Sequence, residues 1–196
     1  MATVALTVEQ YREIIEVIQN GATGIRPNPA IAAVLQIEGN LGLRVGDIVR
    51  TKDEKTGEYH GLRLADIIRD GSRYRLDMTE QKTGKRRTFT VPAEIYSFLR
   101  DYADDHKIGR EDFLFPITVR AVQKHLAKVC DLLELENVST HSFRKFFAVD
   151  VYQQNGHDIA LVQTLLQHSS PAITRRYITV STEQVEQAIA KHTILI

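Results

Sequence analysis

Apolar residues recur near the start of the chain at the three- and four-residue spacing of an amphipathic helix. The first stripe consists of Tyr11, Ile14, Ile15 and Ile18. Thr7 followed by Gln10 has the form of a capping box, and Gly21 suits the C-terminal stop. The pattern therefore predicts a helix that begins after Thr7 and ends before Gly21.

A second helix is predicted from Pro29 to Gly39. Asn28 is a good N-cap, and proline fits the first helical position because its ring already holds the helical φ. A short helical turn is predicted to follow from Val45 to Val49.

Between positions 74 and 91 the apolar period changes to two, which is typical of half-buried strands. The alternating apolar residues are Tyr74, Leu76, Met78, Phe89 and Val91. The polar connection QKTGK carries Gly84 for a tight turn, so the segment predicts a β-hairpin. An upstream strand through Leu62, Leu64 and Ile67 is also predicted, and the polar stretch 51–61 is interpreted as a surface loop.

Helical periodicity returns after the hairpin. Its apolar positions are Ile95, Phe98, Leu99 and Tyr102 in one helix and Val122, Leu126, Val129 and Leu133 in another. Thr140 is predicted to cap a helix that runs through Tyr152, and Asp158 is predicted to cap one that runs through Leu166. The last predicted helical segments begin at Ser170 and Ser181.

These elements predict a mostly α (α+β) protein, a compact helical domain with a small three-stranded antiparallel β-sheet. The 196 residues, of which 43% are apolar, are enough to bury a core. Lys+Arg and Asp+Glu both number 25, which argues against a polybasic protein but leaves room for a locally basic site. The single cysteine, Cys130, excludes an intrachain disulfide scaffold and argues against structural zinc. Because no apolar run approaches the roughly 18 residues of a membrane span and no signal peptide is recognisable, a cytoplasmic location is expected.

The candidate chemistry is concentrated in the C-terminal third. His141 and Arg144 lie three positions apart, on one helical face near an N-terminus, where anions are favoured. His168 precedes Tyr177 by nine residues. Arginine forks neutralise phosphate oxygens, a tyrosine can attack phosphorus, and a lysine or histidine can transfer protons, so the residue types suit a phosphodiester. The full set is Arg44, Lys82, His141, Arg144, His168 and Tyr177.

This set resembles the catalytic domain of the tyrosine recombinase (phage integrase) family. The family pattern is an arginine in a G-L-R-x-x-[DE] turn, a lysine in a β-hairpin, H-x-x-R, a second His or Trp, and a tyrosine about nine residues later. The six residues fill these places in order, and Asp47 fills the acidic place after the first arginine. The resemblance extends from about Leu41 to Ile178.

The resemblance implies a site-specific recombinase or integrase that cleaves and rejoins DNA through a 3′-phosphotyrosine intermediate. Tyr177 would attack the scissile phosphate and leave a free 5′-hydroxyl. Arg44, His141 and Arg144 would supply the cationic pocket that a tyrosine of ordinary pKa near 10 needs in order to ionise. Exchange of one phosphodiester for another is close to energy-neutral, so ATP, a metal or another cofactor is not expected.

Two residues of the set are assigned to the phosphate oxygens. Lys82 would protonate the leaving 5′-oxygen, and it is favoured over Lys85 because the family lysine lies in a Q-K-T-G type of turn. His168 would hydrogen-bond the phosphate. The residues expected to contact DNA outside the catalytic set are Lys85, Arg86, Arg87 and Arg175. The segments 41–100 and 141–180 are net positive and the others net negative, as expected of one basic face turned toward DNA.

The sequence departs from the family pattern at a few positions. Thr51 to Gly61 has the form of an insertion between the first-arginine helix and the following strand. Gln167 stands where the family commonly has glycine, and Lys145 where histidine is frequent.

The domain organisation follows from the same resemblance. Residues 1–196 are expected to form the catalytic domain, without the N-terminal core-binding domain of typical members. The chain is then a fragment of a longer phage or mobile-element integrase, or a short invertase. Residues 181–196 are a candidate docking segment: Val185 and Ile189 with the apolar tail would pack on a neighbouring copy or on their own domain.

The expected partners are double-stranded DNA, other copies of the chain in a tetramer on DNA, and a directionality factor, with no membrane. Two alternatives stay open on the sequence. One is a nicking and closing enzyme similar to type IB topoisomerases, and the other is a non-catalytic DNA-binding protein that keeps the fold.

Overall fold

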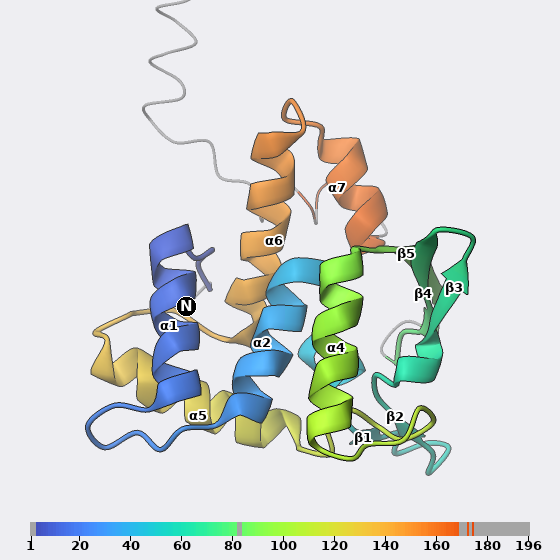
Figure 1. Ribbon diagram of the computed structural model, residues 1–196. Coiled ribbons are helices and arrows are strands. Elements are labelled where there is room, and N and C mark those ends of the chain that lie inside the picture. Colours follow the sequence, from blue (N-terminus) through green and yellow to red (C-terminus); the bar gives the residue numbers. More distant parts are fainter. Residues whose placement is uncertain (1–2, 82–83, 169–171, 173, 175–196) are drawn as a thin grey trace, which may run out of the picture. The chain divides into compact units, whose positions relative to one another are not determined.

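A computed structural model describes residues 3–81, 84–168, 172 and 174 of the chain (Figure 1). The chain divides into two units, Met1–Phe147 and Ala148–Ile196. The first unit contains the helices α1 to α5, the strands β1 to β5 and the beginning of α6. The second contains the end of α6 and α7.

Helix α1 spans Val8–Asn20 and begins with the predicted capping box. The Thr7 hydroxyl accepts the Gln10 N–H at 3.2 Å, and the Gln10 side chain accepts the Thr7 N–H at 3.0 Å. The two orphan donors of the first turn are therefore satisfied reciprocally. The predicted apolar stripe is turned inward, with Ile14 and Ile18 fully buried.

Helix α2 spans Pro29–Leu41, and the side chain of Asn28 caps its first turn as predicted. The helix continues past Gly39, where the sequence predicted its end. Gly39 lies inside the helix, at a position where a Cβ would lie 2.8 Å from Cε2 of Tyr11, so the glycine makes room for that ring. The stop is Gly42, whose φ of +57° is the left-handed conformation that glycine adopts without strain.

The predicted helical turn after Gly42 is helix α3, Val45–Ile48. The segment after it, interpreted from the sequence as a surface loop, contains two short strands instead. β1, Thr51–Lys52, pairs antiparallel with β2, Tyr59–His60. The side chain of Asp53 accepts two backbone N–H groups of the turn between them, so the turn is closed locally and brings the strands together.

The predicted upstream strand begins later than expected. Leu62 lies before it, and the next residues form a 3-10 turn, η1, over Leu64–Asp66. The carboxylate of Asp66 accepts the Arg63 N–H at 2.8 Å, which holds the chain in this turn. The strand itself is β3, Ile67–Asp70.

The predicted hairpin is confirmed. β4 spans Arg73–Thr79 and β5 spans Arg86–Val91, and the three strands form an antiparallel sheet in the order β3-β4-β5. The register places Leu76 opposite Phe89 on the face turned toward the core. The sheet is therefore the small three-stranded one that the sequence predicted.

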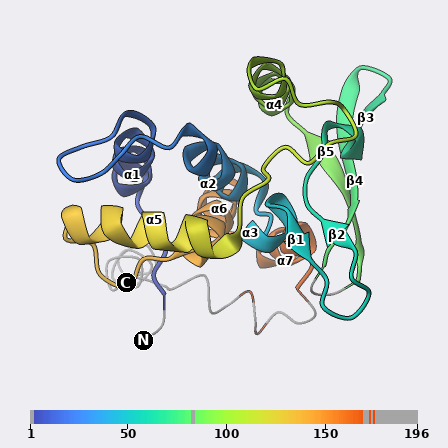
Figure 2. The same cartoon turned by 90° about the horizontal axis from the view of Figure 1, so that it is seen from below.

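Helices α4, Ala93–Asp105, and α5, Val119–Leu132, complete the first unit. The ring of Tyr96 on α4 stacks on Tyr74 of β4 with centroids 3.9 Å apart, so α4 is fixed against the sheet. Helix α5 runs crosswise to α1 and α2 (Figure 2). Its buried residues, including Cys130, join the core that α1 and α2 line.

Helix α6 spans Thr140–Gln154, close to the predicted limits, and α7 spans Ile159–Leu166. The side chain of Asp158 accepts two N–H groups of the first turn of α7, so the predicted N-cap is confirmed. In the helical segment predicted from Ser170, the structure describes positions 172 and 174, and both are helical. The segment predicted from Ser181 lies outside the described residues. Within the described residues, no helix is both long and apolar enough to span a bilayer.

Candidate active site

Arg44 lies at the N-terminal end of α3, directly after the buried Leu43. Its side chain is 22% exposed, and its Nη1 donates a hydrogen bond of 2.5 Å to Oε2 of Glu80. Within the described part of the chain, Nε and Nη2 of Arg44 make no hydrogen bond. These two nitrogens form one edge of the guanidinium fork and can together bind two oxygens of an anion.

Asp47 connects the Arg44 turn to the base of the β4–β5 hairpin. It is buried, and its Oδ1 accepts the backbone N–H of Gln81 at 2.9 Å. Burial raises the pKa of Asp47, and the negative charge of Glu80 adds to this, whereas the Gln81 hydrogen bond and the charge of Arg44 oppose it. The supporting role predicted for Asp47 fits this contact, because the contact fixes the turn relative to the hairpin.

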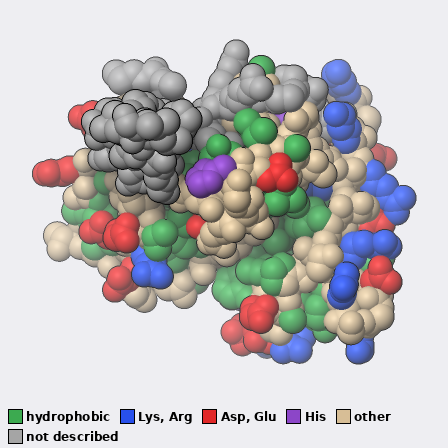
Figure 3. All heavy atoms as spheres, turned by 90° about the horizontal axis from the view of Figure 1, so that it is seen from above, with side chains coloured by type: hydrophobic (Ala, Val, Ile, Leu, Met, Phe, Trp, Pro, Cys, Tyr) green, Lys and Arg blue, Asp and Glu red, His purple; other side chains and the backbone are tan. Residues whose placement is uncertain are grey.

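The basic residues of the hairpin differ in their surroundings. Lys85 and Arg86 are exposed, and Arg86 makes two hydrogen bonds to the carboxylate of Asp77 at 2.5 and 2.6 Å. Lys and Arg side chains gather on the side of the first unit formed by the β3–β4–β5 sheet (Figure 3). The DNA contacts assigned to Lys85 and Arg86 stay predictions. Lys82 lies outside the described residues.

Arg87 does not have the position that the sequence analysis gave it. Its side chain is 1% exposed, and its Nη1 donates to Oε1 of Glu80 at 2.9 Å. Its Nη2 donates to the carbonyl oxygens of Leu41 and Gly42 at 3.1 and 3.2 Å. Arg87 alternates inward on β5, so its guanidinium joins the hairpin to the end of α2. We therefore correct its assignment from a surface phosphate contact to an internal structural one.

His141 and Arg144 lie in the first turns of α6, as predicted. His141 is half-buried, and Arg144 is buried with its Nη1 donating to the carbonyl oxygen of Gly42. The same carbonyl accepts Arg87, so Gly42 is a common acceptor for two arginines. The H-x-x-R helix is thereby attached to the turn that carries Arg44. The phosphate contact of Arg144 itself stays a prediction.

A carboxyl group that the sequence analysis did not select lies near Arg144. Glu38 on α2 is 1% exposed, and its Oε2 has no hydrogen-bond partner among the described residues. Burial raises the pKa of Glu38 well above its usual value, although the charge of Arg144 opposes the shift. The surroundings of Arg144 therefore contain a carboxyl whose charge depends on pH.

His168 is the one predicted catalytic residue of the second unit that the structure describes. It follows Gln167, the C-cap of α7, whose φ is +52°. This conformation explains why the family commonly has glycine at that place. The Nδ1 of His168 lies 3.0 Å from the Thr174 hydroxyl, and its carbonyl oxygen accepts the Gln163 side chain at 3.3 Å. Tyr177 and Arg175 lie outside the described residues.

The structure thus brings together, within the first unit, the Arg44 turn, the start of α6 and the base of the hairpin. Glu80 and Glu38, the acidic groups beside these segments, were not among the site residues predicted from the sequence. Glu80 had a usable signal, because it is an acidic residue directly before the basic QKTGK segment. Glu38 had none, because an acidic residue within a helix is ordinarily exposed. In the described parts of the chain no group of three or more His, Cys, Asp or Glu side chains could hold a metal ion.

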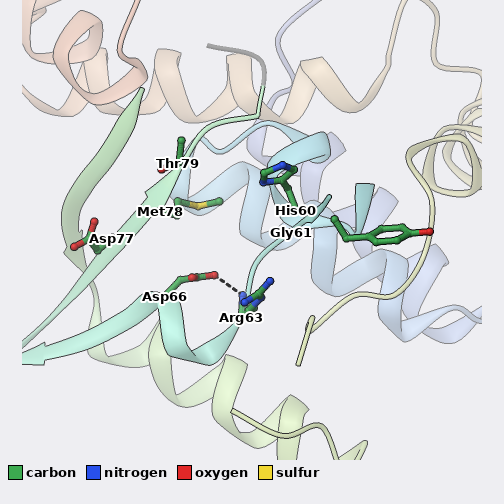
Figure 4. Close-up of a pocket in the computed structure, with 8 residues that line it drawn as sticks. His60, Gly61, Arg63, Asp66, Asp77, Met78 and Thr79 are labelled. Atoms are coloured by element: carbon green, nitrogen blue, oxygen red, sulfur yellow. Dashed lines mark hydrogen bonds between the residues drawn. The ribbon is translucent and has the colours of Figure 1, made fainter. Parts of the chain in front are cut away.

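A separate cavity of about 290 Å³ lies between η1, β2 and β4 (Figure 4). Its lining includes His60, Arg63, Asp66 and Asp77, from elements on which none of the six predicted catalytic residues lies. Burial raises the pKa of Asp66, and the hydrogen bond from the Arg63 N–H opposes this shift. The lining carries both positive and negative side chains, and it includes none of Arg44, Arg87 and Arg144.

Comparison with protein families places residues 5–184 of the chain in the profile described as "Phage integrase family". The chain is similar to the integrase/recombinase YoeC of Bacillus subtilis, with 32% identity over 139 residues that cover 65% of this chain and 75% of YoeC. It is also similar to the tyrosine recombinase XerA of Pyrococcus horikoshii, with 27% identity over 198 residues that cover 95% of this chain and 60% of XerA. The chain spans 44% of a further relative, the integrase/recombinase y4qK of Sinorhizobium fredii, so it matches only part of the longer relatives.

Solved structures share the fold. The XerH site-specific recombinase in a post-cleavage complex with its difH substrate aligns with a TM-score of 0.69 and 20% identity, over 95% of this chain and 52% of XerH. The catalytic domain of bacteriophage HP1 integrase aligns with a TM-score of 0.62 and 19% identity, over 97% of this chain and 95% of that domain. The fold class predicted from the sequence is therefore confirmed.

Proposed function

Since the chain belongs to the phage integrase family, we propose that it is a site-specific DNA recombinase that breaks and rejoins strands through a 3′-phosphotyrosine formed on Tyr177. The attack of the phenolate on the scissile phosphorus forms the tyrosyl–phosphate bond and releases the 5′-oxygen, which takes up a proton. The 5′-hydroxyl of a second strand then reverses these steps and restores the phosphodiester. One phosphodiester replaces another, so the cycle needs no ATP and no metal ion.

One observation carries this proposal. The guanidinium of Arg44 is held on one side by Glu80, while the Nε and Nη2 edge makes no hydrogen bond to the described residues. An arginine fixed in this way can bind two non-bridging oxygens of a phosphate without first losing side-chain entropy. Such preorganised donors stabilise the charge that grows on the phosphate in the transition state.

The remaining roles are assigned by the family pattern. Arg144 would bind the phosphate together with Arg44, and His141 lies on the same helix as Arg144. Lys82 would protonate the 5′-oxygen, and His168 would donate to the phosphate. The Thr174 hydroxyl lies 3.0 Å from Nδ1 of His168, and this contact orients the ring.

The partners follow from the same proposal. Double-stranded DNA is the substrate, and exposed Lys85 and Arg86 are candidates for contacts to its backbone. Four copies would assemble on two sites, with residues 181–196 as the docking segment. A phage or mobile element would supply the sites, and a directionality factor would choose between integration and excision.

Covalent capture of DNA tests the proposal without knowledge of the target site. The chain is incubated with a library of nicked duplexes that have randomised arms and a fluorescent label on the strand that would remain attached. A nick just downstream of the cleavage position lets the short fragment with the free 5′-hydroxyl diffuse away, which traps the intermediate. We expect a labelled adduct on a denaturing gel. Relaxation of supercoiled plasmid without strand exchange selects a nicking and closing enzyme, and sequence-selective binding with no adduct selects a non-catalytic DNA-binding protein.

A further inference from the structure

Glu80 is the last residue before the hairpin turn, and its side chain is 0% exposed. Its backbone closes the turn, because its N–H donates to the Lys85 carbonyl at 2.9 Å and its carbonyl accepts the Gly84 N–H at 2.9 Å. The position of the Glu80 carboxylate is therefore set by the hairpin itself.

The two carboxylate oxygens of Glu80 bind two arginines, one that precedes Glu80 in the sequence and one that follows it. Oε2 accepts Nη1 of Arg44 at 2.5 Å, and Oε1 accepts Nη1 of Arg87 at 2.9 Å. A fully buried carboxylate is costly unless it is paired and hydrogen-bonded, and these two guanidinium groups satisfy it. Glu80 in turn reduces the repulsion between the two positive charges that it brings together.

Arg87 fixes the other side of this arrangement. Its Nη2 donates to the Leu41 and Gly42 carbonyls, which precede Arg44 by three and two residues. Glu80 and Arg87 therefore hold both the backbone before Arg44 and the side chain of Arg44. If the carboxylate were absent, the Arg44 side chain would lose its only hydrogen bond within the described residues and would populate several rotamers.

On the basis of the function proposed above, we propose that Glu80 is a positioning residue for the reaction. It holds Nη1 of Arg44 so that Nε and Nη2 of the same guanidinium are oriented to bind the non-bridging oxygens of the scissile phosphate. Glu80 itself does not touch the DNA. Its contribution to the rate is therefore exerted entirely through Arg44.

The test compares the rate of covalent capture on two nicked substrates, one with a normal scissile phosphodiester and one with a methylphosphonate at that position. The methylphosphonate lacks the negative charge, so it has much less need of Arg44. We expect Glu80→Gln to slow capture of the normal substrate by about tenfold to a hundredfold, as loss of a preorganised donor does. On the methylphosphonate the ratio of wild-type to variant rates should fall to within about threefold.

A double-mutant cycle adds a readout that a purely structural role would not give. In the Arg44→Ala background, Glu80→Gln should cause no further loss of capture, since its effect passes through Arg44. Asp70→Asn is the matched control, because Asp70 also pairs with an arginine of the same sheet, at 3.6 Å from Arg75, but is exposed. This control should stay within about twofold of the wild-type rate.

Folding is checked by urea unfolding of each variant. If Glu80→Gln does not fold, the double variant with Arg87→Gln replaces it, because that pair removes both buried charges together and should show the same substrate dependence. Equal losses on both substrates, or a further loss in the Arg44→Ala background, would overturn the positioning role, as would a wild-type rate for Glu80→Gln. A wild-type chain that forms no adduct overturns the proposed function, and the positioning role with it.

Discussion

The guanidinium of Arg144 on α6 donates a hydrogen bond to the carbonyl oxygen of Gly42, a residue 102 positions earlier in the chain. Gly42 ends α2 in the left-handed conformation, and Arg44 follows two residues later. One backbone turn therefore carries the first arginine and receives the second. The two arginines that the proposed mechanism places on a phosphate are coupled through this turn before any DNA is bound.

Because both arginines are held in place in this way, the rate of covalent capture should be sensitive even to their replacement by lysine. We expect Arg44→Lys and Arg144→Lys each to slow covalent capture by about a hundredfold or more, because an ammonium group cannot reproduce the bidentate guanidinium fork. Arg100→Lys on α4 is the control, since Arg100 is 52% exposed and pairs with its neighbour Asp101. Capture at near wild-type rates by either of the first two variants would contradict their assignment to the phosphate.

The different surroundings of Arg86 and Arg87 predict opposite phenotypes for two adjacent residues. Arg87→Gln leaves the buried Glu80 short of one partner, so it should lower the free energy of unfolding by about 3–5 kcal/mol. Arg86→Gln should leave stability nearly unchanged and reduce the salt dependence of DNA binding. Urea unfolding and DNA-binding titrations at two salt concentrations measure the two effects. A stable Arg87→Gln protein would refute the internal role given to Arg87.

Glu38 predicts a dependence of stability on pH. Burial raises its pKa above the usual 4.5, so the folded chain binds this proton more tightly than the unfolded chain does. Its contribution to stability is therefore fully present below pH 4.5 and is lost as the pH rises through the raised pKa. The unfolding free energy of Glu38→Gln minus that of the wild type should be more positive at pH 8 than at pH 5.

The control for this measurement is Glu16→Gln, which removes an exposed carboxylate on α1. The repulsion from Asp47 and the attraction of Arg144 both act on Glu38, and they are retained in the control. An identical pH dependence in the wild type and in Glu38→Gln would show that the carboxyl ionises as it does in the unfolded chain.

Cys130 should be inert in the folded chain. It is 4% exposed, and burial raises the pKa of its thiol to about 11. At pH 8 only about one thiol in a thousand is then ionised, and the thiolate is the reactive form. A thiol reagent such as DTNB should react slowly with the native chain and rapidly in denaturant. Equally fast reaction in both conditions would place Cys130 at the surface.

Local signals predicted much of the fold. The capping box at Thr7, the Asn28 cap and the Gly84 turn each act within a few residues, so the sequence pattern contains them. The end of α2 was misplaced at Gly39 because the glycine there makes room for Tyr11, a contact that no local pattern shows. The short hairpin of β1 and β2 was missed because strands of two residues are too short for an alternating pattern.

In the candidate site, too, some features were visible in the sequence and others depend on contacts that only the folded chain makes. The ordered spacing of Arg44, His141 and Arg144 was visible in the sequence, and the structure brings their backbone segments together. The internal role of Arg87 was not visible, because an arginine in a basic hairpin has the pattern of an exposed surface. The acidic Glu80 directly before the basic QKTGK segment indicated a charge pair, but not that the pair is buried. The structure shows that they form a buried pair. The side chain of Arg87 points inward from β5, and the end of α2 lies against it, where the Leu41 carbonyl accepts its Nη2.

Whether Tyr177 is the nucleophile is decided by capture of nicked DNA with the wild-type chain and with Tyr177→Phe. We expect a covalent adduct with the wild type and none with Tyr177→Phe, while both proteins bind the same DNA equally well in a native gel. Removal of a single phenolic oxygen leaves the binding surface in place and takes away the attacking atom. An adduct that persists in Tyr177→Phe would show that another residue is the nucleophile.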